Sequence, residues 1–433
     1  MVNVYHYNHN NSFAQLRDAS TMRAFRQVCL ATTLLALSPA LANAQANRAE
    51  VLHWWTSGGE SAAVKVFADQ FEAAGGDWVD TAIAGGPNAR TAGINRIVGG
   101  NPPTVMQFNT GKQFDELVAN DLLRNVDQLA EEGKWREIMP KPIVDAVVRD
   151  DHFYAVPVNI HGQNWLFYNV KLFQDAGLEP PKTWPELITD GQKLKERGII
   201  PVALGGQPNW EHALFRTVLV GHGGADLFRK IYGDSDTDTV QGDTFKEVAE
   251  IFGQMRKLVD PGSPGRNWND ATALVITGKA AMHFMGDWAK GEFTAAGLSP
   301  GKDYGCAIVG EGGELVIGGD VFVFPKTDDE AVHATQDKMA RVMLDPKTQL
   351  EFNKKKGSIP VRLDVDVSSM DECAQKGAKI LADPKKQVEA MELLSSPDLS
   401  GALQDVVTQY WNNPNMDVDS FVQSFVDAME SAG

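Results

Sequence analysis

The stretch EVLHWWTSGGESAAVKVFADQFEA, residues 50–73, decides the fold class of this chain. Its first residues, Glu50 to Trp54, predict a short strand. Between Ser61 and Ala73 the apolar residues recur at the spacing of one helix face, at Val64, Phe67, Ala68 and Phe71. The stretch therefore predicts a strand followed directly by a helix.

Similar units follow along the chain. We expect strands at 79–83, 104–108 and 199–204, and helices at 89–98, 114–119, 184–197, 244–259 and 419–429. Alternating strands and helices predict an α/β fold with mostly parallel sheets flanked by helices. Because 433 residues exceed one ordinary core, we expect two lobes with a ligand cleft between them.

Polar and aromatic residues gather where the predicted strands end. Trp54, Trp55 and Glu60 follow the first strand, and Gln107 and Asn109 end the third. Open α/β sheets bind ligands beyond the carboxyl ends of their strands. We therefore expect these side chains on one wall of the cleft.

Tryptophan indicates the ligand class. Several of the ten tryptophans lie beside hydrogen-bonding residues, as in Trp54-Trp55 with Glu60, Asn209-Trp210 and Asp287-Trp288, and Gln107-Phe108-Asn109 offers the same combination with a phenylalanine. The flat face of a pyranose packs on an indole, and its hydroxyls need carboxylate, amide or ammonium partners. Each tryptophan could instead be a half-buried packing residue, but the repeated combination favours a sugar site.

The N-terminal segment has the pattern of an export leader over residues 1–44. Arg23 and Arg26 precede the apolar run 28–37, and Ala42-Asn43-Ala44 offers small residues for cleavage, with Met22 an alternative start. The net charge of -17 argues against a nucleic-acid partner. We expect a periplasmic monomer.

Two cysteines, Cys306 and Cys373, remain after leader removal, since Cys29 lies within it. In an oxidising compartment they can pair if their Cα atoms lie within about 7 Å, which leaves a disulfide and two free thiols equally open. No Cys and His cluster has zinc spacing, and no glycine loop has the pattern that cradles phosphate. We expect neither metal nor cofactor.

The mature chain resembles the glucose-binding and related monosaccharide-binding proteins of bacterial ABC importers, within the extracellular solute-binding proteins. The resemblance rests on these segments: His53-Trp-Trp-Thr-Ser-Gly-Gly-Glu60, Asn88-Ala-Arg90, Gly99-Gly-Asn-Pro-Pro-Thr-Val-Met-Gln107, Val156-Pro-Val-Asn-Ile-His161, Gly278-Lys-Ala-Ala-Met-His-Phe-Met-Gly-Asp-Trp288 and Lys356-Gly-Ser-Ile-Pro360. The double Trp, Asn-Ile-His and Lys-Gly-Ser-Ile pieces are the most specific.

The resemblance implies two lobes joined by three crossings, near Val156, Asp320 and Ile359, with the sugar held between them. It places residues 45–156 plus 318–359 in the first lobe and 157–317 plus 360–433 in the second. It implies ligand contacts for Trp54 or Trp55, Glu60, Gln107, Trp288, Asp320 and Lys356, with a polar group at Asn109. It implies weaker candidates at Asn159, His161 and Trp210, and the membrane permease of an ABC importer as partner.

Three ligand questions stay open at this point. Glucose-binding members of the family carry His-Gly shortly before the last helices, and residues 389–400 have no such pair. We therefore expect an aldohexose as ligand and leave open which aldohexose it is. A polyamine or peptide receptor is an alternative, because an acidic cleft with tryptophans can cage a cation. A secreted glycosidase is a second alternative, because two carboxylates in a sugar cleft can also hydrolyse a glycoside. We expect no enzyme, since no nucleophile motif is present.

Overall fold

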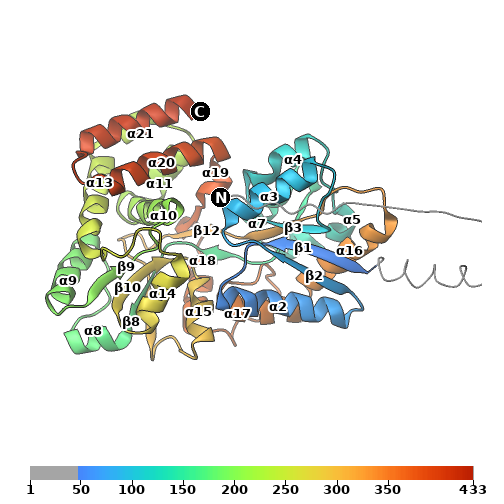
Figure 1. Cartoon of the computed structure of the whole chain (residues 1–433), viewed down its shortest axis with the longest axis horizontal. Helices are drawn as coiled ribbons and strands as arrows, with labels where there is room; N and C mark the ends of the chain where they lie inside the picture. The colour runs from blue at the N-terminus through green and yellow to red at the C-terminus, as the bar shows by residue number, and fades with distance from the viewer. Residues whose placement is uncertain (1–46, 433) are drawn as a thin grey trace, which may run out of the picture. The chain divides into compact units, whose positions relative to one another are not determined.

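The computed structural model describes residues 47–432 and has the α/β architecture predicted from the sequence (Figure 1). The predicted leader, the alternative start at Met22 and Cys29 lie outside the described residues. No helix within 47–432 is long and apolar enough to cross a bilayer.

The first lobe is built on a five-stranded sheet of order β2-β1-β3-β13-β6. Its strands are β1 (Arg48–His53), β2 (Asp77–Ala82), β3 (Val105–Asn109), β6 (Ala155–Pro157) and β13 (Asp320–Val323). β1 runs parallel to β2 and β3, whereas β13 runs antiparallel to β3 and β6. Its helical segments are α2 (Gly58–Ala73), α3 (Gly86–Val98), η1 (Lys112–Phe114), α4 (Asp115–Ala119), α5 (Asp127–Glu132), α6 (Trp135–Ile138), α7 (Lys141–Val147), α16 (Glu330–Leu344) and α17 (Pro346–Lys356).

The second lobe is built on a four-stranded sheet of order β11-β8-β10-β9. Its strands are β8 (Trp165–Asn169), β9 (Ile200–Ala203), β10 (Ala280–Met285) and β11 (Tyr304–Ala307). The prediction of mostly parallel sheets is wrong here, because β8 is antiparallel to both β10 and β11 and only β9 is parallel to β10. Strand periodicity reports which face is buried and carries no information on strand direction.

Helices surround the second sheet, with the C-terminal helices packed on α10 and α13 (Figure 1). They are α8 (Val170–Ala176), α9 (Trp184–Glu196), α10 (Pro208–Val218), α11 (Gly224–Tyr232), α12 (Thr237–Val240), α13 (Asp243–Met255), α14 (Trp268–Ile276), α15 (Ala289–Ala295), α18 (Glu372–Leu381), α19 (Met391–Leu394), α20 (Pro397–Asn412) and α21 (Val418–Ala432). The aromatic core between α10, α13 and α21 includes Phe215, Phe245 and Phe425.

Helix α2 begins at Gly58, three residues before the predicted start at Ser61. The reason is a capping box: the Glu60 N–H donates to Ser57 Oγ (3.3 Å), and the Ser57 N–H donates to Glu60 Oε2 (3.3 Å). These two bonds satisfy backbone donors that the helix cannot pair itself. They also orient the carboxylate of Glu60, which is buried.

The chain passes between the lobes at three adjacent places. The first connects β6 to β7 (His161–Gly162), the second connects β12 (Leu315–Gly318) to β13, and the third follows α17. Ile160 and Ile359 exchange two backbone hydrogen bonds (2.7 and 3.0 Å), which tie the first and third crossings together. At the second, a Cβ on Gly319 would lie 2.3 Å from the Asn159 carbonyl oxygen, so only glycine fits. The residue boundaries predicted for the lobes stay a prediction.

Two small sheets complete the structure. β7 and β14 (Gln387–Glu389) flank β12 in a three-stranded sheet beside the crossings. β4 (Val148–Arg149) and β5 (His152–Phe153) form a hairpin. β12 and β14 therefore link the C-terminal segment to the crossing region.

Cys306 in β11 and Cys373 in α18 form a disulfide, with Cα atoms 6.0 Å apart. The bond fastens α18, which follows the third crossing, to an edge strand of the second sheet. We predict no titratable thiol in unreduced, denatured protein recovered from the periplasm, and two after reduction. Two free thiols before reduction would contradict the pairing, and a single one would be Cys29 and would mean that the leader is retained.

Candidate functional site

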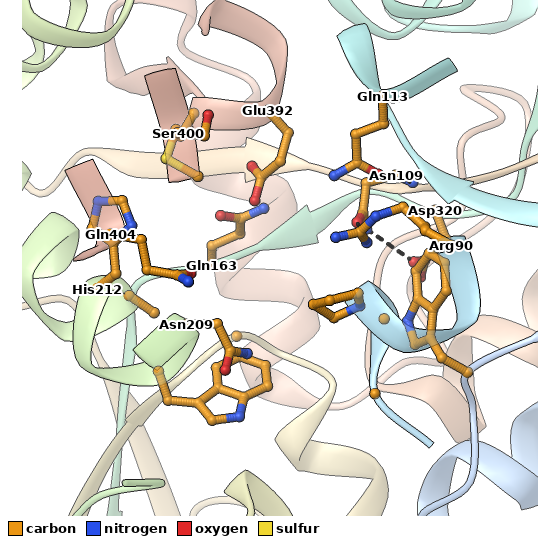
Figure 2. A pocket seen from close by; sticks show the side chains of 18 of the residues that line it. Arg90, Asn109, Gln113, Gln163, Asn209, His212, Asp320, Glu392, Ser400 and Gln404 are labelled. Carbon is orange, nitrogen blue, oxygen red and sulfur yellow. Dashed lines mark hydrogen bonds between the residues drawn. The ribbon is translucent and has the colours of Figure 1, made fainter. Parts of the chain in front are cut away.

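A cavity of about 1340 Å³ lies between the lobes. Its wall includes eight residues predicted from the sequence: Trp54, Glu60, Asn109, His161, Trp210, Trp288, Asp320 and Lys356. Figure 2 shows polar side chains reaching into the cavity from both sides, with Asn109 and Arg90 on one side and Asn209 and Gln404 on the other. Both lobes therefore contribute side chains to the cavity wall.

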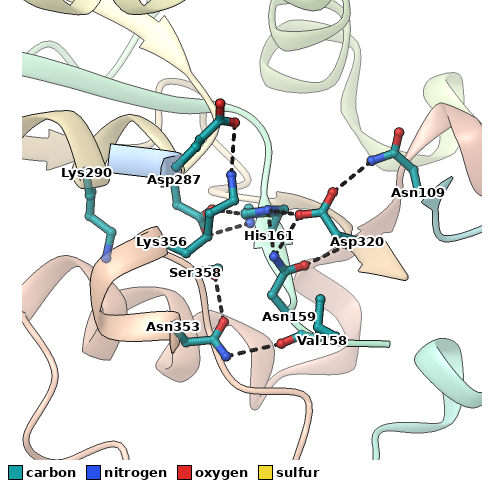
Figure 3. A network of polar contacts seen from close by, with 12 residues as sticks. Asn109, Val158, Asn159, His161, Asp287, Lys290, Asp320, Asn353, Lys356 and Ser358 are labelled. Carbon is teal, nitrogen blue, oxygen red and sulfur yellow. Dashed lines mark hydrogen bonds and ion pairs between the residues drawn. The ribbon is translucent and has the colours of Figure 1, made fainter. Parts of the chain in front are cut away.

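Asp320, the first residue of β13, is the centre of a buried hydrogen-bond network (Figure 3). Its Oδ1 accepts from Gln107 Nε2 (3.0 Å) and from Asn109 Nδ2 (3.4 Å). Its Oδ2 accepts from Asn159 Nδ2 (2.8 Å) and His161 Nε2 (2.9 Å). Four donors thus hold one carboxylate in place at the second crossing.

His161 lies between two carboxylates at the start of β7. Its Nε2 faces Asp320, and its Nδ1 bonds Asp287, which also accepts from the Gly162 N–H (2.9 Å). Burial alone would lower the pKa of His161, but the charges and hydrogen bonds of Asp287 and Asp320 outweigh burial and raise it. An imidazolium with both N–H groups donating fits this geometry.

The pKa of Asp320 is lowered in the same network. Burial would raise this pKa, but the hydrogen bond and charge of His161, together with the charge of Lys356, overcome the effect of burial. Asp320 is therefore an ionised acceptor. A ligand hydroxyl that reaches it meets a charged hydrogen-bond partner, which is stronger than a neutral one.

Lys356 and Glu60 form a second buried ion pair in the cavity wall. Lys356 Nζ lies 3.3 Å from Glu60 Oε1, and both side chains are at least nine-tenths buried. The ammonium also lies 5.5 Å from the ring centre of Trp55 and 5.9 Å from that of Trp288. Cation and π attraction to two indoles adds to the ion pair.

Tryptophans form the apolar part of the wall. Trp288 packs edge-on against His161, with ring centres 5.0 Å apart, and lies 6.2 Å from Trp210. On the first lobe, Trp54 lies beneath the guanidinium of Arg90 at 5.7 Å. A Cβ on Gly286 would lie 2.1 Å from the Trp288 ring, so this ring position requires glycine at 286.

Comparison with known proteins identifies the family to which this chain belongs. Residues 55–341 match the family described as bacterial extracellular solute-binding protein. The chain belongs to this family. Because the family consists of solute-binding proteins, the prediction that this chain is not an enzyme is confirmed.

Relatives of this solute-binding protein extend over nearly the whole chain. A protein of Brucella suis biovar 1 (strain 1330), named a probable sugar-binding periplasmic protein, is 37% identical over 93% of this chain and 97% of its own length. A Rhizobium meliloti (strain 1021) protein of the same name is 36% identical, covering 95% of this chain and 100% of its own. The crystal structure of the solute receptor AcbH has the same fold, with a TM-score of 0.77 at 17% identity over 89% of this chain and 98% of its own.

Three predicted contact candidates of this solute-binding protein, Trp55, Gln107 and Asn159, lie off the cavity wall. Trp55 is 1% exposed and packs against Phe322 and Phe352 in the first-lobe core. Gln107 is fully buried and bridges the Trp54 N–H and Asp320. Asn159 is fully buried as well and donates to Asp320 (2.8 Å). The structure therefore places these three side chains behind Trp54 and Asp320, and their contact with a ligand stays a prediction.

Several cavity residues were not among the predicted contacts. They are Arg90, Gln163, Arg216, Trp268 and Glu392. Arg90 belongs to the segment Asn88-Ala-Arg90 of the family resemblance. The others come from segments with no strand-end pattern, so only their approach in three dimensions identifies them. Within residues 47–432 no cluster of His, Cys, Asp and Glu could hold a metal ion.

Proposed function

We propose that this solute-binding protein captures an aldohexose in the periplasm and delivers it to the membrane permease of an ABC importer. The observation that carries the proposal is the cavity wall, where Trp54, Trp210 and Trp288 accompany the ionised acceptor Asp320 and the donor Lys356. A pyranose needs both kinds of group. The names of the two proteobacterial relatives support a sugar as ligand.

The buried charges favour a neutral ligand over a polyamine. Glu60 is paired with Lys356, and His161 is paired with both Asp287 and Asp320. A polycation needs carboxylates that the protein leaves unpaired in a desolvated site. Each of these carboxylates already has a Lys or His partner, and the cavity residue Glu392 has Arg216 beside it (3.6 Å), so hydroxyl groups suit the site better than a polycation.

The ionisation of Asp320 also disfavours a glycosidase. A general acid for glycoside hydrolysis needs a raised pKa so that it carries a proton near neutral pH. The pKa of Asp320 is lowered instead. Family membership and this ionisation state agree on binding without hydrolysis.

A hexose should raise the melting temperature of the protein by several degrees at a concentration far above its dissociation constant. The reason is that a ligand bound only to the folded state adds about 2.7 kcal/mol of stability at a hundredfold excess over that constant. The measurement is thermal unfolding of periplasmic protein with aldohexoses, aldopentoses, disaccharides and polyamines.

Nitrophenyl glycosides incubated with the same preparation serve as the control and should stay intact. A shift with a polyamine and with no sugar would replace the sugar proposal by the polyamine alternative. Release of nitrophenol would contradict pure binding.

A further inference from the structure

Arg216 and Glu392 form a long ion pair in the cavity wall, with no hydrogen bond between the two side chains. Arg216 is on α10 and Glu392 on α19, and both line the cavity. Arg216 Nη1 lies 3.6 Å from Glu392 Oε1, which is beyond hydrogen-bond length. Figure 2 shows Glu392 reaching into the cavity between Ser400 and Gln113.

The pair keeps unused hydrogen-bonding capacity. Nε and Nη1 of Arg216 and Oε2 of Glu392 have no hydrogen-bond partner among the described residues, although they are covered from solvent. Buried polar atoms nearly always have a partner, and an unpaired one marks a place where a further group is expected. A donor and an acceptor are therefore available side by side.

The backbone at Glu392 is held by the first lobe. Gly111 has a φ of +110°, and a Cβ there would lie 2.0 Å from the Glu392 carbonyl oxygen. Lys112 Nζ also donates to the Leu394 carbonyl (2.7 Å). These contacts keep α19 against η1, so the Glu392 side chain has a defined position at the cavity.

Arg90 faces Glu392 from the first lobe. Burial lowers the pKa of Arg90, and the charge of Glu392 opposes that effect. The carboxylate is thus within electrostatic reach of one arginine from each lobe. It is not a solvated surface charge.

We propose that Arg216 and Glu392 determine which hexose is accepted, by binding one ring hydroxyl that accepts from Arg216 and donates to Glu392. This inference rests on the proposed function. A hydroxyl is the group that supplies both a donor and an acceptor from one atom. In an epimer this hydroxyl points in another direction, so Arg216 and Glu392 lose both hydrogen bonds and the epimer binds more weakly.

The test is calorimetric titration of wild type, Glu392→Gln and Glu389→Gln. The titrants are D-glucose, D-galactose and D-mannose, followed by the monodeoxy forms of the hexose that wild type binds best. Glu389 is a matched control, because it lies three residues before Glu392 in the chain but does not line the cavity. Its carboxylate pairs with Arg229 (2.8 Å).

Glu392→Gln should weaken the best hexose roughly tenfold or more, and the loss should vanish for the one deoxy sugar that lacks the bound hydroxyl. Glu389→Gln should bind as wild type does. Arg216→Lys, which keeps the charge without the guanidinium fork, should weaken the same hexose and spare the same deoxy sugar.

Two results overturn the inference. One is wild-type affinity of Glu392→Gln for all three hexoses, and the other is an equal loss for every deoxy sugar. If Glu392→Gln does not fold, Arg216→Lys decides on the same criteria. Failure of the wild type to bind any sugar is a separate result, which removes the proposed function itself and the hexose inference with it.

Discussion

Replacement of Asp320 by alanine should abolish sugar binding and lower the free energy of unfolding by about 3 to 5 kcal/mol. The carboxylate accepts from Gln107, Asn109, Asn159 and His161. Without it, buried His161 loses one of its two carboxylate partners, and three amide side chains lose an acceptor. The measurements are urea unfolding and calorimetric titration with the hexose that wild type binds.

The effect should depend on pH in a defined way. The folded pKa of His161 is raised above 6.5, so its contribution is complete below pH 6.5 and is lost as pH rises through the folded value. The folded pKa of Asp320 is lowered below 3.8, so its contribution is complete above pH 3.8 and is lost as pH falls through the folded value. The stability difference between wild type and Asp320→Ala should therefore be largest between pH 3.8 and pH 6.5.

Asp328→Asn is the matched control, because Asp328 is an exposed carboxylate eight residues further along the chain. Its free energy of unfolding should stay within about 0.5 kcal/mol of wild type. A loss below about 1 kcal/mol for Asp320→Ala, or unchanged sugar affinity, would show that the network is not the centre of the site.

Replacement of Trp288 by alanine should remove about 2 to 4 kcal/mol of sugar binding free energy, which is roughly 30-fold to 1000-fold in affinity. The indole contacts His161 and Lys356 and lines the cavity, so it offers a stacking face beside the charged network. Its loss removes stacking area and admits water to the buried ions. Trp288→Phe should recover part of the affinity, because a smaller ring keeps part of that face.

Trp78→Ala separates binding from folding in this experiment. Trp78 is a half-buried tryptophan of β2 that does not line the cavity. The Trp78→Ala protein should be less stable than wild type and should keep the sugar affinity of wild type. Equal sugar affinity of Trp288→Ala and wild type would contradict the placement of the sugar between the lobes.

The α/β class and part of the site could be predicted because they depend on local patterns. Apolar spacing identified β1, α2 and β3, and the position of polar residues after strands identified Trp54, Asn109 and their neighbours. Such patterns fail where neighbours on the chain have different environments. Trp54 and Trp55 are adjacent, yet one lines the cavity and the other lies in the core.

The sequence by itself determined the strand and helix succession, the candidate tryptophans and carboxylates, and the two cysteines available for pairing. Only the tertiary structure decided the antiparallel direction of β8, the supporting role of Gln107 and the approach of Arg216 to Glu392. The physical reason is sequence separation: burial and capping arise from residues a few positions apart. Contacts such as His161 with Asp287 and Asp320 arise only when the chain returns across the lobes, and the path of that return decides which charges meet.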